Sequence, residues 1–156
     1  MAAEVGSKAP DITLVNQDRE PVKLSDQIGS DNIVLAFFPG AFSRVCTTEM
    51  CTFRDSMGEL KSLGARIFGI STDTFFALKA WGDQQNLPFP LLSDYNKEAI
   101  KAYDVVNPDM VGLKNIAKRA LIVIDKKGVI RYREALDDAR NEPDYNKLKE
   151  ELKKLA

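Results

Sequence analysis

Short apolar runs separated by polar turns recur along the chain and predict buried strands. Two of them are Asn32–Phe38, which a Pro-Gly pair ends, and Arg66–Ser71. Continuous apolar runs of this length are typical of strands buried on both faces, as in the middle of an α/β sheet. A third run, Ala120–Asp125, is followed by a Lys-Lys-Gly turn and by Val129–Tyr132. This later pattern predicts a hairpin.

Between these strands, apolar side chains recur at steps of three and four, the period of an amphipathic helix. One stretch predicts a helix from about Val45 to Ser62, with a stripe made of Cys46, Met50, Phe53, Met57 and Leu60. A second predicted helix covers 75–85, and Asp73 or Thr74 is its candidate cap. A third, shorter helix is predicted at Asn96–Tyr103.

The two ends of the chain complete the pattern. Near the start, Ile12–Val15 and Val22–Leu24 enclose a polar turn and predict a short N-terminal β-hairpin. Near the end, Pro143 is expected in the first turn of a helix whose inward stripe is Tyr145, Leu148, Leu152 and Leu155. This order predicts an α/β fold with a central mixed β-sheet flanked by helices. A thioredoxin-like fold has this order, and other three-layer α/β folds share it.

Composition narrows the class of protein. A chain of 156 residues suits a single domain, 1–156, and 44% hydrophobic with 29% charged residues is typical of a soluble globular protein. The net charge of −1, with both signs mixed, gives no electrostatic basis for binding nucleic acid or an anionic membrane. No apolar run approaches the roughly 18 residues that span a bilayer. Because the start of the chain lacks the features of a signal peptide, we expect a cytoplasmic protein.

The chain has two cysteines and no histidine. The missing histidine excludes a Ser-His-Asp or Cys-His nucleophile and every histidine-based metal site. Two thiolates alone make a poor structural zinc site, so we expect no metal. A reactive cysteine in this chain must therefore be activated by something other than an imidazole.

Cys46 is expected in the first turn of the long helix, just after a buried strand and a short loop. Unpaired N–H groups and the positive end of the helix dipole favour a thiolate there. Ser43 can cap this helix or turn its hydroxyl toward the sulfur, and Pro39 offers an apolar wall without an N–H. Helix geometry alone leaves an inert core thiol equally open, because Cys46 shares its stripe with Met50 and Phe53.

Cys51 follows five residues later and lies about 140° around the helix from Cys46, off the apolar stripe. In an intact helix, such residues are roughly 8–9 Å apart at Cα. Disulfides usually need less than about 7 Å. A bridge between these cysteines within one chain therefore requires the start of the helix to unwind.

The spacing Pro39-x3-Ser43-x2-Cys46 resembles the signature of the peroxiredoxin family. The segment Cys46–Asp55 resembles the group of bacterioferritin comigratory protein (thiol peroxidase Q), and Phe-Phe-Pro-Gly-Ala-Phe before it is similar to the AhpE-like branch. Family-like segments follow in order and are Gly69–Asp73, Pro90–Asp94 and Arg119–Asp125. The resemblance covers almost the whole chain.

The resemblance implies a thioredoxin-like fold and the reduction of hydrogen peroxide or organic hydroperoxides without a metal or cofactor. It implies that Cys46 is the peroxidatic cysteine, which is oxidised to a sulfenic acid. Ser43 then matches the hydroxyl that binds the peroxide, Pro39 the residue that shields the site, and Arg119 the guanidinium that stabilises the thiolate. Cys51 matches the resolving cysteine, which forms a disulfide that a thioredoxin-like or glutaredoxin-like protein reduces.

Other interpretations stay open at this point. Many relatives lack a cysteine at the position of Cys51 and use an external thiol, and a homodimer is among the family's oligomeric states. A thiol–disulfide exchange protein or a redox-controlled chaperone uses the same fold, although a C-x-x-C motif is absent from the sequence. Without the resemblance, Arg119 reads as an arginine of a surface or structural ion pair. Trp81 and the Phe75–Phe76 pair are expected in the core or at a subunit interface.

Overall fold

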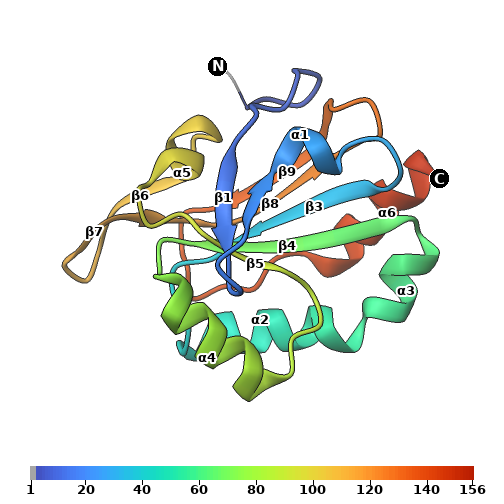
Figure 1. Ribbon diagram of the computed structural model, residues 1–156. Helices are drawn as coiled ribbons and strands as arrows, with labels where there is room; N and C mark the ends of the chain where they lie inside the picture. Colours follow the sequence, from blue (N-terminus) through green and yellow to red (C-terminus); the bar gives the residue numbers. More distant parts are fainter. Residues whose placement is uncertain (1–2) are drawn as a thin grey trace.

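A computed structural model describes residues 3–156 of the chain. Its central sheet consists of β1 (Thr13–Asn16), β2 (Pro21–Lys23), β3 (Asn32–Phe37), β4 (Ala65–Ser71), β5 (Leu91–Ser93), β8 (Arg119–Ile124) and β9 (Ile130–Leu136). The strand order is β2-β1-β5-β4-β3-β8-β9 (Figure 1). The central strands β3, β4 and β5 are parallel, and the outer strands join them antiparallel. The N-terminal hairpin, β1 and β2, thus extends this sheet through β5.

Helices cover both faces of the sheet. They are α1 (Leu24–Gln27), α2 (Arg44–Asp55), α3 (Met57–Ser62), α4 (Phe75–Gln85), α5 (Glu98–Ala102) and α6 (Tyr145–Leu155). In Figure 1, α2 and α4 lie below the sheet, whereas α1 and α5 lie above it. The predicted α/β fold, with a mixed sheet flanked by helices, is confirmed.

The strand pattern explains why one sheet supports two cores. On β3, Ile33, Leu35 and Phe37 pack into the core that includes residues of α1 and α5. Val34 and Ala36 alternate with them and pack into the core that includes residues of α2, α4 and α6. All five side chains are fully buried, as expected for a strand covered on both faces. The apolar run Asn32–Phe38 therefore contains β3, one of the central strands, and leads directly to the loop before α2.

The predicted helix from Val45 to Ser62 is two helices, α2 and α3, separated at Ser56. The backbone of Ser56 leaves helical geometry, and its N–H is shared between the carbonyls of Thr52 and Phe53. The apolar stripe continues across the break, since Phe53 and Leu60 are both buried. Periodicity alone could not detect the break because both helices pack on the same core.

Two further predictions need correction, and one hairpin is an addition to the predicted elements. Pro143 lies outside the last helix, because Asp144 is its cap and accepts from the N–H of Lys147. Leu24 begins α1 instead of ending β2. The hairpin of β6 (Val106–Met110) and β7 (Leu113–Ala117) was not predicted. Most of its side chains are at least partly exposed, so it lacks the alternation that marks a half-buried hairpin.

Trp81 lies in the core, as one of its two interpretations predicted. Its side chain is fully buried against Phe38, with the ring centroids 5.1 Å apart. Its indole N–H donates to the hydroxyl of Thr47, on the first turn of α2. Thr74, one of the two candidate caps, accepts from the N–H of Ala77 at the start of α4. Within residues 3–156, no helix is long and apolar enough to cross a membrane.

Candidate functional site

Cys46 lies in the first turn of α2, where the chain enters a helix after the central strand β3. Its side chain is fully buried in the core below the sheet, and its thiol is free of any disulfide. The first N–H groups of a helix have no partners within it, and they create a positive field at this end. The local fold therefore favours negative charge on a sulfur that is otherwise surrounded by apolar side chains.

Because the chain has no histidine, the positive charge beside Cys46 comes from Arg119. It is the first residue of β8, and its guanidinium Nη2 lies 3.2 Å from Cys46 Sγ. The side chain is only 2% exposed, so solvent screens this contact very little. The same guanidinium donates to the main-chain oxygen of Ala139, in the loop before α6. Strand β8 and this loop thus fix the guanidinium against the sulfur from two directions.

Glu49 is the site residue that the sequence analysis did not identify. Its Oε1 accepts from Arg119 Nη1 at 2.7 Å, and its side chain has no solvent exposure. Burial raises the pKa of Glu49 to about 7, although Arg119 partly offsets the effect. For Arg119, burial acts to lower the pKa, but the nearby Cys46 and Glu49 raise it above its ordinary value.

A signal for Glu49 was present in the sequence. The residue lies three positions after Cys46, so on a helix both side chains occupy one face. A glutamate on an apolar stripe needs a buried partner. Only the tertiary structure shows that this partner is Arg119, because the two residues are 70 positions apart in the sequence.

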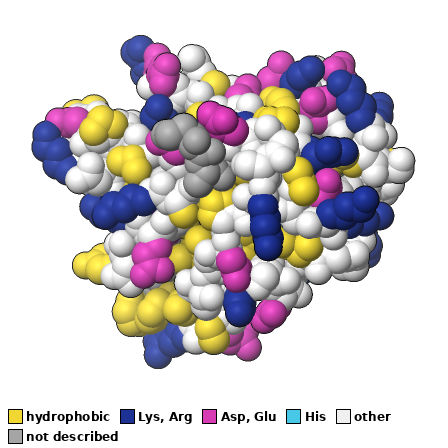
Figure 2. Space-filling model, turned by 90° about the horizontal axis from the view of Figure 1, so that it is seen from above, with side chains coloured by type: hydrophobic (Ala, Val, Ile, Leu, Met, Phe, Trp, Pro, Cys, Tyr) yellow, Lys and Arg dark blue, Asp and Glu magenta, His cyan; other side chains and the backbone are white. Residues whose placement is uncertain are grey.

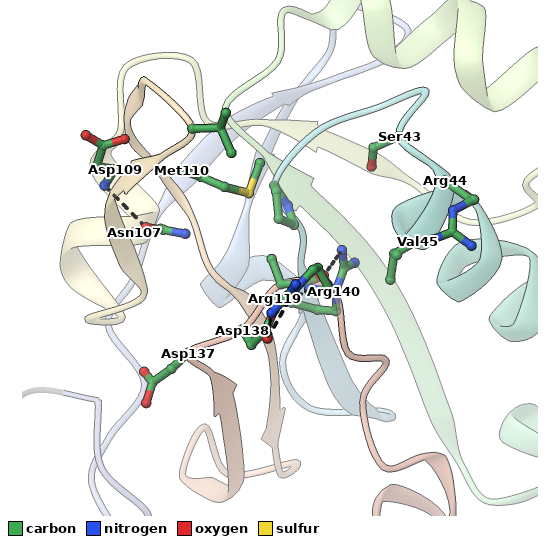
Figure 3. Close-up of a pocket in the computed structure, with 13 residues that line it drawn as sticks. Ser43, Arg44, Val45, Asn107, Asp109, Met110, Arg119, Asp137, Asp138 and Arg140 are labelled. Atoms are coloured by element: carbon green, nitrogen blue, oxygen red, sulfur yellow. Dashed lines mark hydrogen bonds and ion pairs between the residues drawn. The ribbon is translucent and has the colours of Figure 1, made fainter.

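A pocket of about 760 Å³ opens in front of this cluster. Pro39, Ser43 and Arg119 are among the residues that line it, and Cys46 lies buried behind them, in contact with Arg119. Figure 3 shows that Ser43 and Val45, from the start of α2, lie on one side, and residues of β6 lie opposite. The hairpin of β6 and β7 therefore contributes a wall of the pocket.

Ser43 occupies the N-cap position of α2, but its side chain makes no capping hydrogen bond. Its hydroxyl donates to the main-chain oxygen of Gly40 at 2.9 Å. The side chain is exposed to the pocket, and a hydroxyl can rotate to serve an incoming ligand. Arg44 also lines the pocket and is exposed.

Cys51 is not part of this cluster. It lies farther along the intact helix α2 and is half-buried, with a free thiol. Its Sγ donates to Oε1 of Gln85, the last residue of α4, at 3.4 Å. The structure thus brings Pro39, Ser43 and Arg119 together around Cys46. Cys51 lies outside this group, against the end of α4.

Comparison with known proteins identifies the family. Residues 5–133 match the AhpC/TSA family. A chloroplastic 2-cysteine peroxiredoxin of Chattonella marina var. antiqua is 37% identical over 142 residues, or 85% of this chain and 70% of that protein. The chain belongs to the AhpC/TSA family. Its resemblance to the peroxiredoxins, noted from the signature around Cys46, is confirmed.

Two further relatives strengthen the assignment. Alkyl hydroperoxide reductase E of Mycobacterium bovis is 36% identical over 132 residues, which are 83% of this chain and 84% of that protein. The crystal structure of peroxidoxin BcpB from Mycobacterium tuberculosis has a TM-score of 0.88 at 26% identity and covers 99% of both chains. The chain spans only 50 to 64% of the plant 2-Cys peroxiredoxins that it matches. Membership of this family supports thiol-dependent peroxidase as the enzyme class of the chain.

Proposed function

We propose that this chain reduces hydrogen peroxide and organic hydroperoxides through the thiolate of Cys46. The observation that carries the proposal is the contact of 3.2 Å between Arg119 Nη2 and Cys46 Sγ, next to an open pocket. A buried cation beside a sulfur favours the thiolate, the form in which cysteine is a nucleophile. The match to the AhpC/TSA family supports the same chemistry.

In the proposed first step, the Cys46 thiolate attacks one oxygen of the peroxide. A sulfur–oxygen bond forms as the O–O bond breaks, so the sulfur is oxidised to a sulfenic acid and the peroxide is reduced. The second oxygen leaves as water or an alcohol after taking up a proton. Negative charge grows on this departing oxygen, and Arg119 and the hydroxyl of Ser43 stabilise it. Pro39 offers an apolar wall that limits access of water, and it has no N–H that could compete as a donor.

In the proposed second step, Cys51 resolves the sulfenic acid as an intramolecular disulfide. A thioredoxin-like or glutaredoxin-like protein then reduces this bridge by thiol–disulfide exchange. The intact α2 helix supports the view that the helix must open first, since residues five apart in a helix are too distant to bridge. A one-cysteine mechanism, in which an external thiol reduces Cys46, is the alternative that keeps Cys51 outside the cycle.

The whole chain, 1–156, is proposed to act as one thioredoxin-like domain in the cytoplasm, without a cofactor. We further propose that two copies of the chain form a homodimer. Figure 2 supports this proposal, because hydrophobic side chains gather at one corner of the visible face, where a second copy could bind, while charges of both signs are scattered elsewhere. Among the large exposed hydrophobic side chains, Phe76 is 62% exposed and Val111 is fully exposed. Sedimentation at increasing protein concentration tests this proposal.

Stopped-flow oxidation by hydrogen peroxide tests the central proposal. The Cys46→Ser variant should lose peroxide turnover completely, since no other residue supplies the nucleophile. If Cys46→Ser keeps the full rate, the proposal fails. An insulin-reduction rate that exceeds the peroxidase rate would favour a thiol–disulfide exchange protein instead. Suppression of aggregation that survives in Cys46→Ser would indicate an additional chaperone activity.

A further inference from the structure

Two bonds tie the second half of α2 to the C-terminal end of α4, and both end on Gln85. Cys51 Sγ donates to Gln85 Oε1 at 3.4 Å. Arg54, nearly one turn farther along α2, donates from Nη1 to the main-chain oxygen of Gln85 at 2.6 Å. Gln85 is the last residue of α4. One residue therefore holds both the thiol of Cys51 and the helical turn that follows it.

The position of Gln85 strengthens the second of these bonds. The last carbonyls of a helix lack partners and carry partial negative charge, so a guanidinium binds them well. Arg54 also forms an ion pair with Asp55, with 3.0 Å between Nε and Oδ1. The bond to Asp55 raises the pKa of Arg54. The cluster thus anchors Cys51 and the turn after it to the end of α4, so Cys51 must break this contact if it is to reach Cys46.

The direction of the first bond matters for reactivity. An amide oxygen only accepts hydrogen bonds, so the sulfur that donates to it carries its proton. The nucleophilic form of cysteine is the thiolate. Cys51 must therefore leave Gln85 before it can lose this proton and attack. Within residues 3–156, Cys51 makes no other hydrogen bond through its side chain.

We propose that Gln85, assisted by Arg54, is a positioning residue that holds Cys51 in the wound helix and sets the rate of the resolving step. This inference rests on the proposed function, in which Cys51 resolves Cys46. After release, the Cys51 thiolate attacks the sulfur of the Cys46 sulfenic acid. A sulfur–sulfur bond forms, the sulfur–oxygen bond breaks, and the hydroxide leaves as water with the proton that Cys51 gave up. The peroxide of the first step has already supplied the oxidising equivalents.

Holding Cys51 also has a competing consequence. While the sulfenic acid waits, a second peroxide can oxidise it to a sulfinic acid, which does not return to the cycle by thiol exchange. A tighter hold on Cys51 therefore increases loss of enzyme by over-oxidation, and a looser hold decreases it. The ratio of disulfide to sulfinic acid thus reports directly on the strength of this contact.

The protein contains its own reporter of helix opening. Trp81 is the single tryptophan, and its indole donates to Thr47, next to Cys46 on α2. Unwinding of the first turn breaks this bond and changes the fluorescence of Trp81. A stopped-flow trace after one equivalent of hydrogen peroxide should therefore show two phases, oxidation of Cys46 and then formation of the disulfide.

The test compares Gln85→Ala and Gln85→Glu with the parent and with Gln84→Ala as the matched control. Gln84 is the exposed neighbour, and its side-chain oxygen accepts from Gln85 Nε2. Gln85→Ala removes the acceptor of Cys51 but keeps the main-chain oxygen for Arg54. We expect its second phase to be roughly fivefold faster, the value of one modest hydrogen bond. Gln85→Glu keeps an acceptor and adds negative charge, so its second phase should be slower and its sulfinic acid yield higher.

In all three variants the first phase should stay within about twofold of the parent, because none of them touches the cluster around Cys46. Equal second phases in the parent, Gln85→Ala and Gln85→Glu would overturn the inference while leaving the proposed function intact, provided that Cys51→Ser lacks this phase. If Cys51→Ser retains the second phase, the intramolecular mechanism fails and the inference fails with it. A change of the same sign in both Gln85 variants would mark a merely structural role and would also overturn it.

Discussion

The two cysteines lie on the same helix, five residues apart, yet their surroundings are opposite in character. Cys46 is fully buried at the N-terminal end of α2 and faces the guanidinium of Arg119. Cys51 is half-buried and faces an amide oxygen at the C-terminal end of α4. One sulfur meets the positive end of a helix and a cation, and the other meets the negative end of a helix and a hydrogen-bond acceptor.

This comparison shows that burial does not by itself decide the reactivity of a thiol. The more buried cysteine is the better candidate nucleophile, because its surroundings supply positive charge. The more accessible one is held by a bond that uses its proton. A peroxidase that resolves itself needs this asymmetry, since only one of the two sulfurs should react with peroxide first.

The largest expected effect comes from replacing the guanidinium of Arg119, which has several donors in one plane, by a single ammonium group. In Arg119→Lys, the charge remains but one ammonium group cannot bind Cys46, Glu49 and the loop carbonyl at once. We expect the second-order rate of Cys46 oxidation to fall by roughly 100- to 1000-fold, as for loss of a donor aimed at developing charge. Stopped-flow fluorescence measures this rate.

Arg133→Lys is the matched control for Arg119→Lys. Arg133 also donates to main-chain oxygens, those of Ala3, Tyr103 and Asp104, and none of its hydrogen bonds reaches Cys46. Its replacement should lower stability and leave the oxidation rate within about twofold. A comparable loss of rate in both variants would mean that Arg119 acts only through stability.

The pH dependence of stability tests the buried surroundings of Cys46, to which Glu49 belongs. Its pKa rises from an ordinary 4.5 to about 7 because of burial. Between these values the folded protein binds a proton that the unfolded chain has lost, so this group's contribution to stability falls as pH increases. Relative to Glu49→Gln, the parent should lose roughly 3 kcal/mol of unfolding free energy between about pH 4 and about pH 8.

Urea denaturation of both proteins at the two pH values measures this difference. Glu150→Gln is a suitable control, since Glu150 is an exposed carboxylate on α6. A pH-independent difference between the parent and Glu49→Gln would show that the pKa of Glu49 is the same in the folded and unfolded chains, so that Arg119 fully offsets the cost of burial.

Ser43 gives a smaller effect. Its hydroxyl now donates to Gly40, and it must rotate to bind a peroxide oxygen. We expect Ser43→Ala to slow the oxidation of Cys46 by roughly fivefold, the value of one hydrogen bond, and Ser43→Thr to retain the parent rate. If Ser43→Ala and Ser43→Thr are equally slow, shape rather than the hydroxyl is the property that matters at this position.

The smallest effect on the first step is expected for Cys51. Because Cys51 lies outside the cluster around Cys46, Cys51→Ser should oxidise Cys46 within about twofold of the parent rate. Mass spectrometry after excess peroxide should then find sulfinic acid on Cys46 and no intramolecular disulfide. A large decrease in the rate of the first phase would contradict the proposed difference between the two cysteines, since it would mean that both sulfurs act together on the peroxide.

Much of the architecture was predictable because it depends on local patterns. The apolar runs at β3, β4 and β8 and the stripe of α2 follow directly from the periodicity of burial. The break at Ser56 and the hairpin of β6 and β7 were not predictable in this way. The first leaves the stripe intact, and the second is largely exposed, so neither changes the hydrophobic pattern that the sequence displays.

By itself, the sequence determined that Cys46 follows a buried strand at the start of a helix, and that no histidine activates it. Only the tertiary structure decided what surrounds each sulfur. Glu49 meets Arg119 across 70 positions, and Cys51 meets Gln85 across 34. Such contacts arise when β8 and β3 pair and when α4 packs beside α2. The physical reason is that the strength of a charge or a hydrogen bond depends on distance and burial, and packing sets both.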